Sequence, residues 1–178
     1  MKNKIKAFVF DMDGVLLDTE TICFKTWIIA GKEKYLPPEK VELAQKKCLG
    51  TNKDELVHEI EWSEGIDLMP YAKETLLYLK ENGYRLALAS STRGESVKRQ
   101  MTNAGLIDFF EVIVTGDMVT HSKPDPEIYT LAVKKLGLQA EDCICVEDSP
   151  NGIRSAKSAG LFTIMVPDKI EQDEKLLE

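Results

Sequence analysis

Short apolar segments alternate with helix-like segments along most of this chain, and this alternation strongly constrains the fold. Five runs rich in β-forming residues are predicted to be strands, at 5–10, 84–89, 111–114, 143–146 and 162–166. Helices are expected between them, at 71–82, 95–104, 126–136 and 152–159. Because strands that alternate with helices need crossover connections, the pattern predicts an α/β fold with a parallel sheet covered on both faces.

The segment after the first strand interrupts the alternation. Residues 19–34, 38–48 and 52–62 all have helical patterns, and they are separated by Pro37-Pro38 and by Gly50. We therefore interpret 18–65 as a small helical cap. It is inserted into a Rossmann-like parallel-sheet core that is formed by 1–17 and 66–178.

Composition excludes several classes of partner. The net charge is −7, which disfavours binding to nucleic acid. No apolar run approaches the length of a membrane span, and residues 1–10 lack the apolar segment of a signal peptide. The four cysteines form no C-x-x-C pair, and Cys143 and Cys145 share one face of a predicted strand. These features predict a reduced, cytoplasmic protein without a nucleic-acid or membrane partner.

Polar side chains follow the predicted strands, where parallel α/β sheets bind their ligands. They are Asp11 and Asp13 after the first strand, Ser90 and Ser91 after the second, 115–117 after the third, and Glu147 and Asp148 after the fourth. Two acidic pairs and a hydroxyl pair are therefore expected at one edge of the sheet.

These residue types suit phosphoryl transfer. In a D-x-D pair, one carboxylate can attack phosphorus, while the other protonates the leaving oxygen and later activates water. Crowded carboxylates repel one another, and Mg²⁺, which prefers hard oxygen ligands, would remove that cost. Ser90 can donate hydrogen bonds to phosphate oxygens, and Lys123, which Pro124 and Pro126 follow in its loop, offers a point charge. The expected partner is a small phosphorylated metabolite.

Each signal also has a simpler interpretation. A D-x-D after a strand can be a polar turn, and an EF-hand loop is an alternative, although the glycine falls at the fourth position rather than the sixth. Lys123 can be a solvated loop residue, and Asp148 can cap the following helix. Order and position favour the functional interpretation, because all four elements follow strands of one sheet or lie in a loop near them.

Four motifs in order carry a family resemblance. Residues 11–15, 89–91, 122–126 and 146–153 resemble the successive motifs of the haloacid dehalogenase-like hydrolases, most closely the β-phosphoglucomutase-like and sugar-phosphatase branch. The resemblance implies that Asp11 is the nucleophile that forms an aspartyl-phosphate and that Asp13 is the general acid and base. It also implies that Mg²⁺ is held by Asp11, the backbone carbonyl of Asp13 and Asp148, with Glu147 as a ligand or as a partner of the ligands.

The substrate-binding residues depart from the mutase pattern. The resemblance implies that Ser90, beside Ser91, holds the phosphoryl group together with Lys123. Mutases of this branch carry a histidine where this chain has Cys23, and a K-G-x-x-R run where this chain has 49–53. Lys53 replaces the arginine, and lysine is a poorer bidentate phosphate clamp, so a phosphatase is favoured over a phosphomutase.

The chain is also shorter than this branch leads us to expect. Asp11 and Ser90 are only 79 positions apart, and the sequence ends soon after 166–168, where relatives add a strand and a helix. A weakly active or regulatory member of the same fold, or an enzyme whose site is completed in a homo-oligomer, is therefore an alternative. A receiver domain is the non-enzyme alternative, but it would place its phosphorylated aspartate after the third strand, not the first.

Overall fold

The computed structural model describes residues 5–22 and 65–166, which contain a five-stranded sheet. The strands are β1 (Ala7–Phe10), β2 (Arg85–Ala89), β3 (Val112–Val114), β4 (Cys143–Glu147) and β5 (Phe162–Met165). Every neighbouring pair is parallel, in the order β3-β2-β1-β4-β5. All five predicted strands and the parallel sheet are therefore confirmed.

Helices connect the strands as predicted, with small differences at their ends. They are α4 (Ala72–Glu81), α5 (Gly94–Asn103), α6 (Glu127–Leu136) and α7 (Pro150–Ser158). Three short 3₁₀ helices, η1 (Ile107–Phe109), η2 (Gly116–Met118) and η3 (Ala140–Asp142), were not predicted, because three residues show no periodicity.

The start of α7 corrects one interpretation. The Ser149 hydroxyl accepts a hydrogen bond from the Gly152 N–H at 3.0 Å, and Pro150 occupies the first turn. The helix therefore begins two residues earlier than predicted. Ser149 is its N-cap, and the suggestion that Asp148 caps this helix is wrong.

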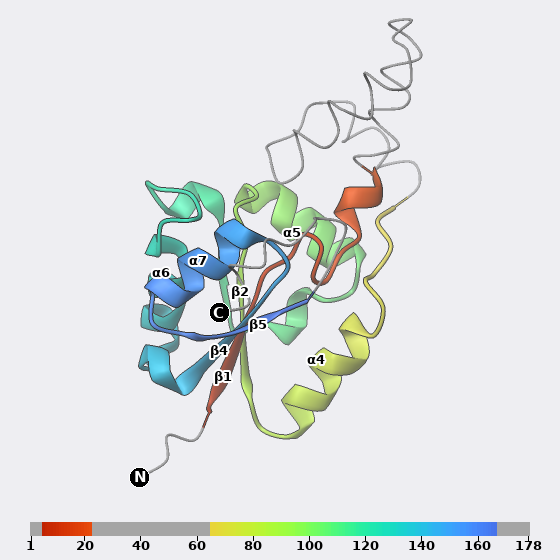
Figure 1. Cartoon of the computed structure of the whole chain (residues 1–178). Helices are drawn as coiled ribbons and strands as arrows, with labels where there is room; N and C mark the ends of the chain where they lie inside the picture. Colours follow the sequence, from red (N-terminus) through yellow and green to blue (C-terminus); the bar gives the residue numbers. More distant parts are fainter. Residues whose placement is uncertain (1–4, 23–64, 167–178) are drawn as a thin grey trace, which may run out of the picture.

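The sheet is covered on both faces, and side chains alternate between two cores. Figure 1 shows α4 and α5 on one side of the sheet and α6 and α7 on the other. Phe10 of β1 packs in the core beneath α4 and α5, whereas its neighbour Val9 packs in the core beneath α6 and α7. Cys143 and Cys145 are buried in the second core as free thiols, on one face as predicted.

The order of the strands indicates where in the sheet a ligand would bind. From β1 the chain proceeds outward to β2 and β3, then returns to the other side of β1 to form β4 and β5. The connections diverge between β1 and β4, and in open α/β sheets the crevice at the carboxyl ends of such strands binds ligands. Asp11 follows β1, and Glu147 ends β4, so both lie at this point.

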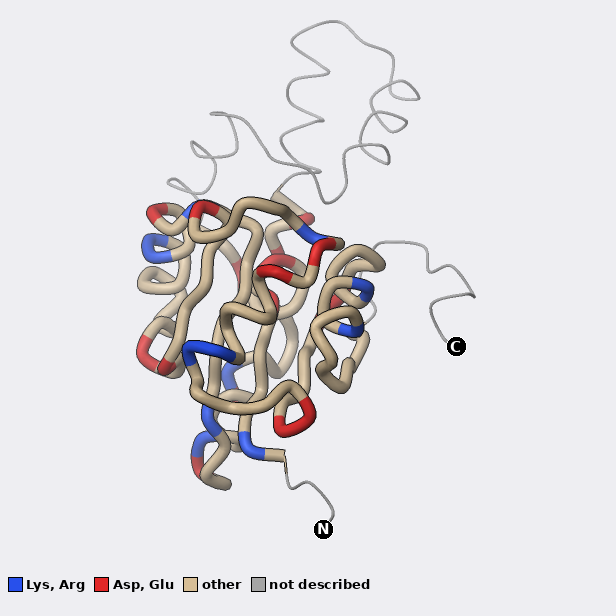
Figure 2. The backbone as a smooth tube through the Cα atoms, turned by 90° about the vertical axis from the view of Figure 1, so that its left-hand side faces the viewer, with Lys and Arg blue, Asp and Glu red and all other residues tan. Residues whose placement is uncertain are grey.

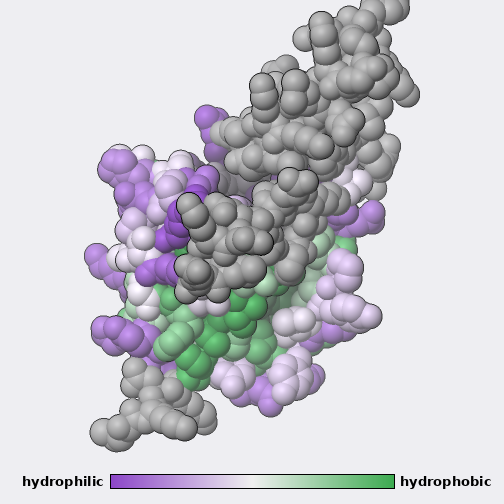
Figure 3. Space-filling model, in the orientation of Figure 1, coloured by the Kyte–Doolittle hydropathy of each residue, from purple (hydrophilic) through white to green (hydrophobic). Residues whose placement is uncertain are grey.

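The edge strand β5 exposes apolar side chains. Phe162 and Ile164 are exposed, and Figure 3 shows an apolar area over this part of the molecule. No helix among residues 5–22 and 65–166 is long and apolar enough to cross a membrane.

Of the predicted cap, residues 19–22 are helical, while the helices expected at 38–48 and 52–62 lie outside the described residues. The domain boundaries therefore stay a prediction.

Candidate active site

Acidic residues gather at the carboxyl ends of β1 and β4. The Asp11 N–H donates to the Val146 carbonyl at 3.0 Å, which continues the β1–β4 pairing beyond β1. Gly14 adopts a left-handed backbone (φ 73°), so the chain turns back directly after Asp13, and the Gly14 N–H donates to the Leu17 carbonyl at 2.9 Å. Figure 2 shows several acidic positions toward this end of the molecule.

Lys123 lies buried between two of these carboxylates. Its Nζ donates to Asp11 Oδ1 at 2.6 Å and to Glu147 Oε1 at 2.7 Å, and it also donates to the Ala89 carbonyl at 3.1 Å. Only 8% of the Lys123 side chain is exposed. The ammonium also lies 5.0 Å from the centre of the Tyr129 ring, a cation–π contact. The interpretation of Lys123 as a solvated loop lysine is therefore wrong.

Glu147 is fixed by hydrogen bonds to both of its oxygens. Besides Lys123, Oε1 accepts from the Tyr129 hydroxyl at 2.9 Å. Oε2 accepts from the Asp148 N–H at 3.0 Å and from the Ser149 N–H and hydroxyl at 2.9 and 3.1 Å. Gly152 leaves room for this carboxylate, because a Cβ there would overlap it. These contacts orient Glu147 toward Lys123.

Burial perturbs the acids of this site strongly. It raises the pKa of Asp11 to about 7, although the Lys123 ammonium opposes the shift. Burial, together with repulsion from Asp11 and Glu147, raises the pKa of Asp148 to about 9. Burial acts against the charge of Lys123, yet attraction to Asp11 and Glu147 outweighs it and holds the pKa of Lys123 above its ordinary value.

Glu147 responds differently from the two aspartates. Its burial favours the neutral form, but Lys123 and the surrounding donors hold its pKa below the ordinary value. Asp11 and Asp148 are therefore the acids whose negative charge is least compensated by the protein.

The donor set fits a hard divalent cation. Oxygens of Asp11, Glu147 and Asp148 lie within 4.8 Å of one another, and all three residues are buried. The group holds three carboxylates and one ammonium, which contacts Asp11 and Glu147, so the charge of one divalent ion would balance it. Because the Glu147 oxygens already accept hydrogen bonds, Asp11 and Asp148 are the carboxylates best placed to bind it.

Asp13 faces a pair of hydroxyls after β2. Its Oδ2 accepts from the Thr92 hydroxyl at 3.0 Å and from the Ser90 hydroxyl at 3.4 Å. Ser90 is fully buried, whereas Ser91 is exposed. Thr92 was not among the predicted site residues, although the run of three hydroxyl residues after β2 was a signal that could have included it.

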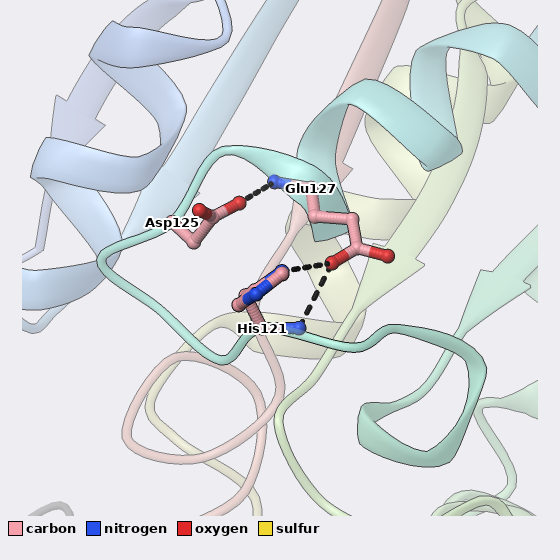
Figure 4. A group of neighbouring side chains, drawn as sticks. All are labelled: His121, Asp125 and Glu127. Carbon is pink, nitrogen blue, oxygen red and sulfur yellow. Dashed lines mark hydrogen bonds and ion pairs between the residues drawn. The ribbon is translucent and has the colours of Figure 1, made fainter.

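A second polar group fastens the loop that carries Lys123. The Glu127 carboxylate accepts from the N–H groups of Thr120 and His121, at 3.0 and 2.8 Å, and lies 3.2 Å from His121 Nδ1. Asp125 accepts from the Glu127 N–H at 3.0 Å, and Figure 4 shows these side chains around the start of α6. Their oxygens are used to hold the loop, which places Lys123 over the site.

Two of the residues singled out from the sequence belong to the predicted cap. Cys23 and Lys53 both lie outside the described residues. The described part of the site therefore consists of the ends of β1, β2 and β4 and the Lys123 loop.

Comparisons with known proteins find a matching family, similar sequences and similar folds. A family model described as haloacid dehalogenase-like hydrolase matches residues 5–160. The phosphorylated carbohydrates phosphatase of Thermotoga maritima is 33% identical over 98% of this chain and 91% of its own, and the β-phosphoglucomutase of Bacillus subtilis is 30% identical over 91% and 83%. The crystal structure of CbbY from Rhodobacter sphaeroides in complex with phosphate superposes with a TM-score of 0.74 at 27% identity, covering 96% of this chain and 90% of that one.

Proposed function

The chain belongs to the haloacid dehalogenase-like hydrolases, and we propose that it is a Mg²⁺-dependent phosphatase that acts on a small phosphorylated carbohydrate through an aspartyl-phosphate. The observation that carries the proposal is the buried cluster of Asp11, Lys123, Glu147 and Asp148 at the point where the sheet connections diverge. Asp13, half-buried beside it, supplies the second carboxylate of the D-x-D pair.

In the first half of the reaction, an oxygen of the Asp11 carboxylate attacks phosphorus, and the bond from phosphorus to the ester oxygen breaks. The leaving oxygen takes the proton carried by Asp13, so the alcohol departs neutral and Asp11 carries the phosphoryl group. Lys123, held 2.6 Å from Asp11 Oδ1, lies where it can offset negative charge on the transferring group.

In the second half, the ionised Asp13 takes a proton from a water molecule, and the water oxygen attacks phosphorus. The bond between Asp11 and phosphorus breaks, inorganic phosphate is released, and Asp13 is again protonated. Ser90, whose hydroxyl lies at the end of β2, and Lys123 hold the phosphoryl oxygens in both halves.

Asp11, Asp148 and the backbone carbonyl of Asp13 would hold the magnesium ion. A bound divalent ion would neutralise charge on the phosphoryl oxygens. It would also favour the ionised form of Asp11, because burial raises the pKa of this carboxyl group to about 7. Glu147 keeps Lys123 in place through the contact at 2.7 Å.

Phosphorylated carbohydrates are the proposed substrate class, because curated relatives include a phosphorylated carbohydrates phosphatase and the hexitol phosphatases of Escherichia coli. Hydrolysis is favoured over mutase activity by the sequence of the predicted cap, where Cys23 and Lys53 replace the mutase residues. With β-glucose 1-phosphate and a trace of the 1,6-bisphosphate, we expect little glucose 6-phosphate. Efficient isomerisation would assign the chain to the mutases instead.

The mechanism is tested by following the phospho-enzyme. EDTA should abolish release of phosphate from p-nitrophenyl phosphate, and Mg²⁺ should restore it. In Asp13→Asn, Asp11 can still be phosphorylated by this good leaving group, but breakdown lacks its base, so intact-protein mass spectrometry should detect a persistent phosphoryl adduct. Asp11→Asn should show no adduct. An adduct on Asp11→Asn, or full activity without metal, would contradict the proposal.

A further inference from the structure

Thr92 makes a direct contact with the proposed general acid and base. Its hydroxyl donates to Asp13 Oδ2 at 3.0 Å, across 79 positions of sequence. The weaker contact from the Ser90 hydroxyl, at 3.4 Å, ends on the same oxygen. Both hydrogen bonds from described residues to the Asp13 carboxylate therefore engage Oδ2, and neither engages Oδ1.

The backbone that carries the Thr92 side chain is held in place by hydrogen bonds of the loop after β2. The Thr92 N–H donates to the Ser90 hydroxyl at 3.1 Å, and the Thr92 carbonyl accepts from the Gly116 N–H at 2.9 Å. Gly116 approaches so closely that a Cβ there would overlap the Ser91 carbonyl. The loops that follow β2 and β3 are thus hydrogen-bonded to each other, and the Thr92 hydroxyl lies against Asp13.

We infer that Thr92 is a positioning residue for proton transfer in the proposed phosphatase reaction. Its hydroxyl occupies Oδ2 and sets the rotation of the carboxylate, so that Oδ1 is the oxygen that delivers the proton to the leaving group and later takes one from water. General acid–base catalysis depends on placing one oxygen within hydrogen-bond reach of the reacting atom, so a freely rotating carboxylate delivers its proton less often.

The inference rests on the proposed function and predicts a dependence on the leaving group. Thr92→Val keeps the shape of the side chain but removes the donor. Its kcat/KM should fall about tenfold or more with glycerol 2-phosphate, whose alkoxide must be protonated, and less than about threefold with p-nitrophenyl phosphate, whose phenolate leaves unaided. Thr92→Ser should restore the wild-type ratio, and Thr130→Val, at an exposed position of α6, should leave both values unchanged.

A double-mutant cycle tests whether Thr92 acts through Asp13. In the Asp13→Asn background, Thr92→Val should change the kcat/KM for glycerol 2-phosphate less than twofold, because the group that it positions is absent. Thr92→Ala provides the same comparison if the valine variant does not fold. Equal losses with both substrates, a change confined to KM, or additive effects with Asp13→Asn would overturn the inference. Turnover of both substrates by the wild-type protein establishes phosphatase activity in the same assay, and its absence would overturn both proposals.

Discussion

Replacement of Asp148 by asparagine should stabilise the folded protein at neutral pH in metal-free buffer while it removes activity. Asp148 is 6% exposed, and burial with repulsion from Asp11 and Glu147 raises its pKa from the ordinary value of 3.8 to about 9. A carboxyl group whose pKa is raised on folding stabilises the folded state when it is protonated. This contribution is full below pH 3.8 and is lost as the pH rises toward 9. Asparagine, which is neutral at every pH, avoids that loss.

The size of the effect follows from the same pKa values. At pH 7 the solution lies about three pH units above the ordinary carboxyl pKa, and about 1.4 kcal/mol per unit gives an upper value of about 4 kcal/mol. Relaxation of the site reduces this figure, so we expect Asp148→Asn to raise the free energy of unfolding by about 2 to 4 kcal/mol in EDTA at pH 7. The difference should nearly vanish below pH 4.

Urea unfolding followed by circular dichroism measures this difference at each pH. Asp67→Asn, at an exposed position, is the matched control and should show no such pH dependence. Added Mg²⁺ should narrow the difference in stability, because it stabilises the wild-type protein by about 2.7 kcal/mol at a hundredfold excess over Kd and the variant much less. If Asp148→Asn is less stable than wild type in EDTA at pH 7, or if the gap persists at pH 4, the argument from burial fails.

Other variants probe the contacts around Glu147. Lys123→Met should lower kcat by about a hundredfold or more in steady-state assays, and it should cost about 3 to 5 kcal/mol in urea unfolding at pH 7, because two buried carboxylates lose their partner. Gly152→Ala should destabilise the protein by about 1 to 3 kcal/mol in the same unfolding assay, because its Cβ overlaps the Glu147 carboxylate, whereas Ser158→Ala on the exposed end of α7 should not. Ser149→Ala should lower the free energy of unfolding by about 1 kcal/mol through loss of the α7 cap, and an unchanged value would contradict that role.

The order and type of the elements could be predicted because they depend on local sequence. Residues 5–10 and 84–89 have the short apolar composition of buried strands, and glycines such as Gly137 end helices where the backbone turns left-handed. The position of Asp11 and Asp13 directly after a strand followed from the same pattern. In contrast, the 3₁₀ helices and the start of α7 were missed, because each depends on one turn of backbone or a single cap.

The partners of each site residue were decided only by the tertiary structure. Strand order brings Lys123 to Asp11 across 112 positions, and it brings Thr92 to Asp13 across 79. Sequence named Lys123 as a charge near phosphate but could not show that it lies buried between two carboxylates, nor that Glu147 is used to hold it. Spacing along a chain fixes which face of an element a side chain occupies, whereas its pKa and its hydrogen bonds depend on atoms that only packing brings within reach.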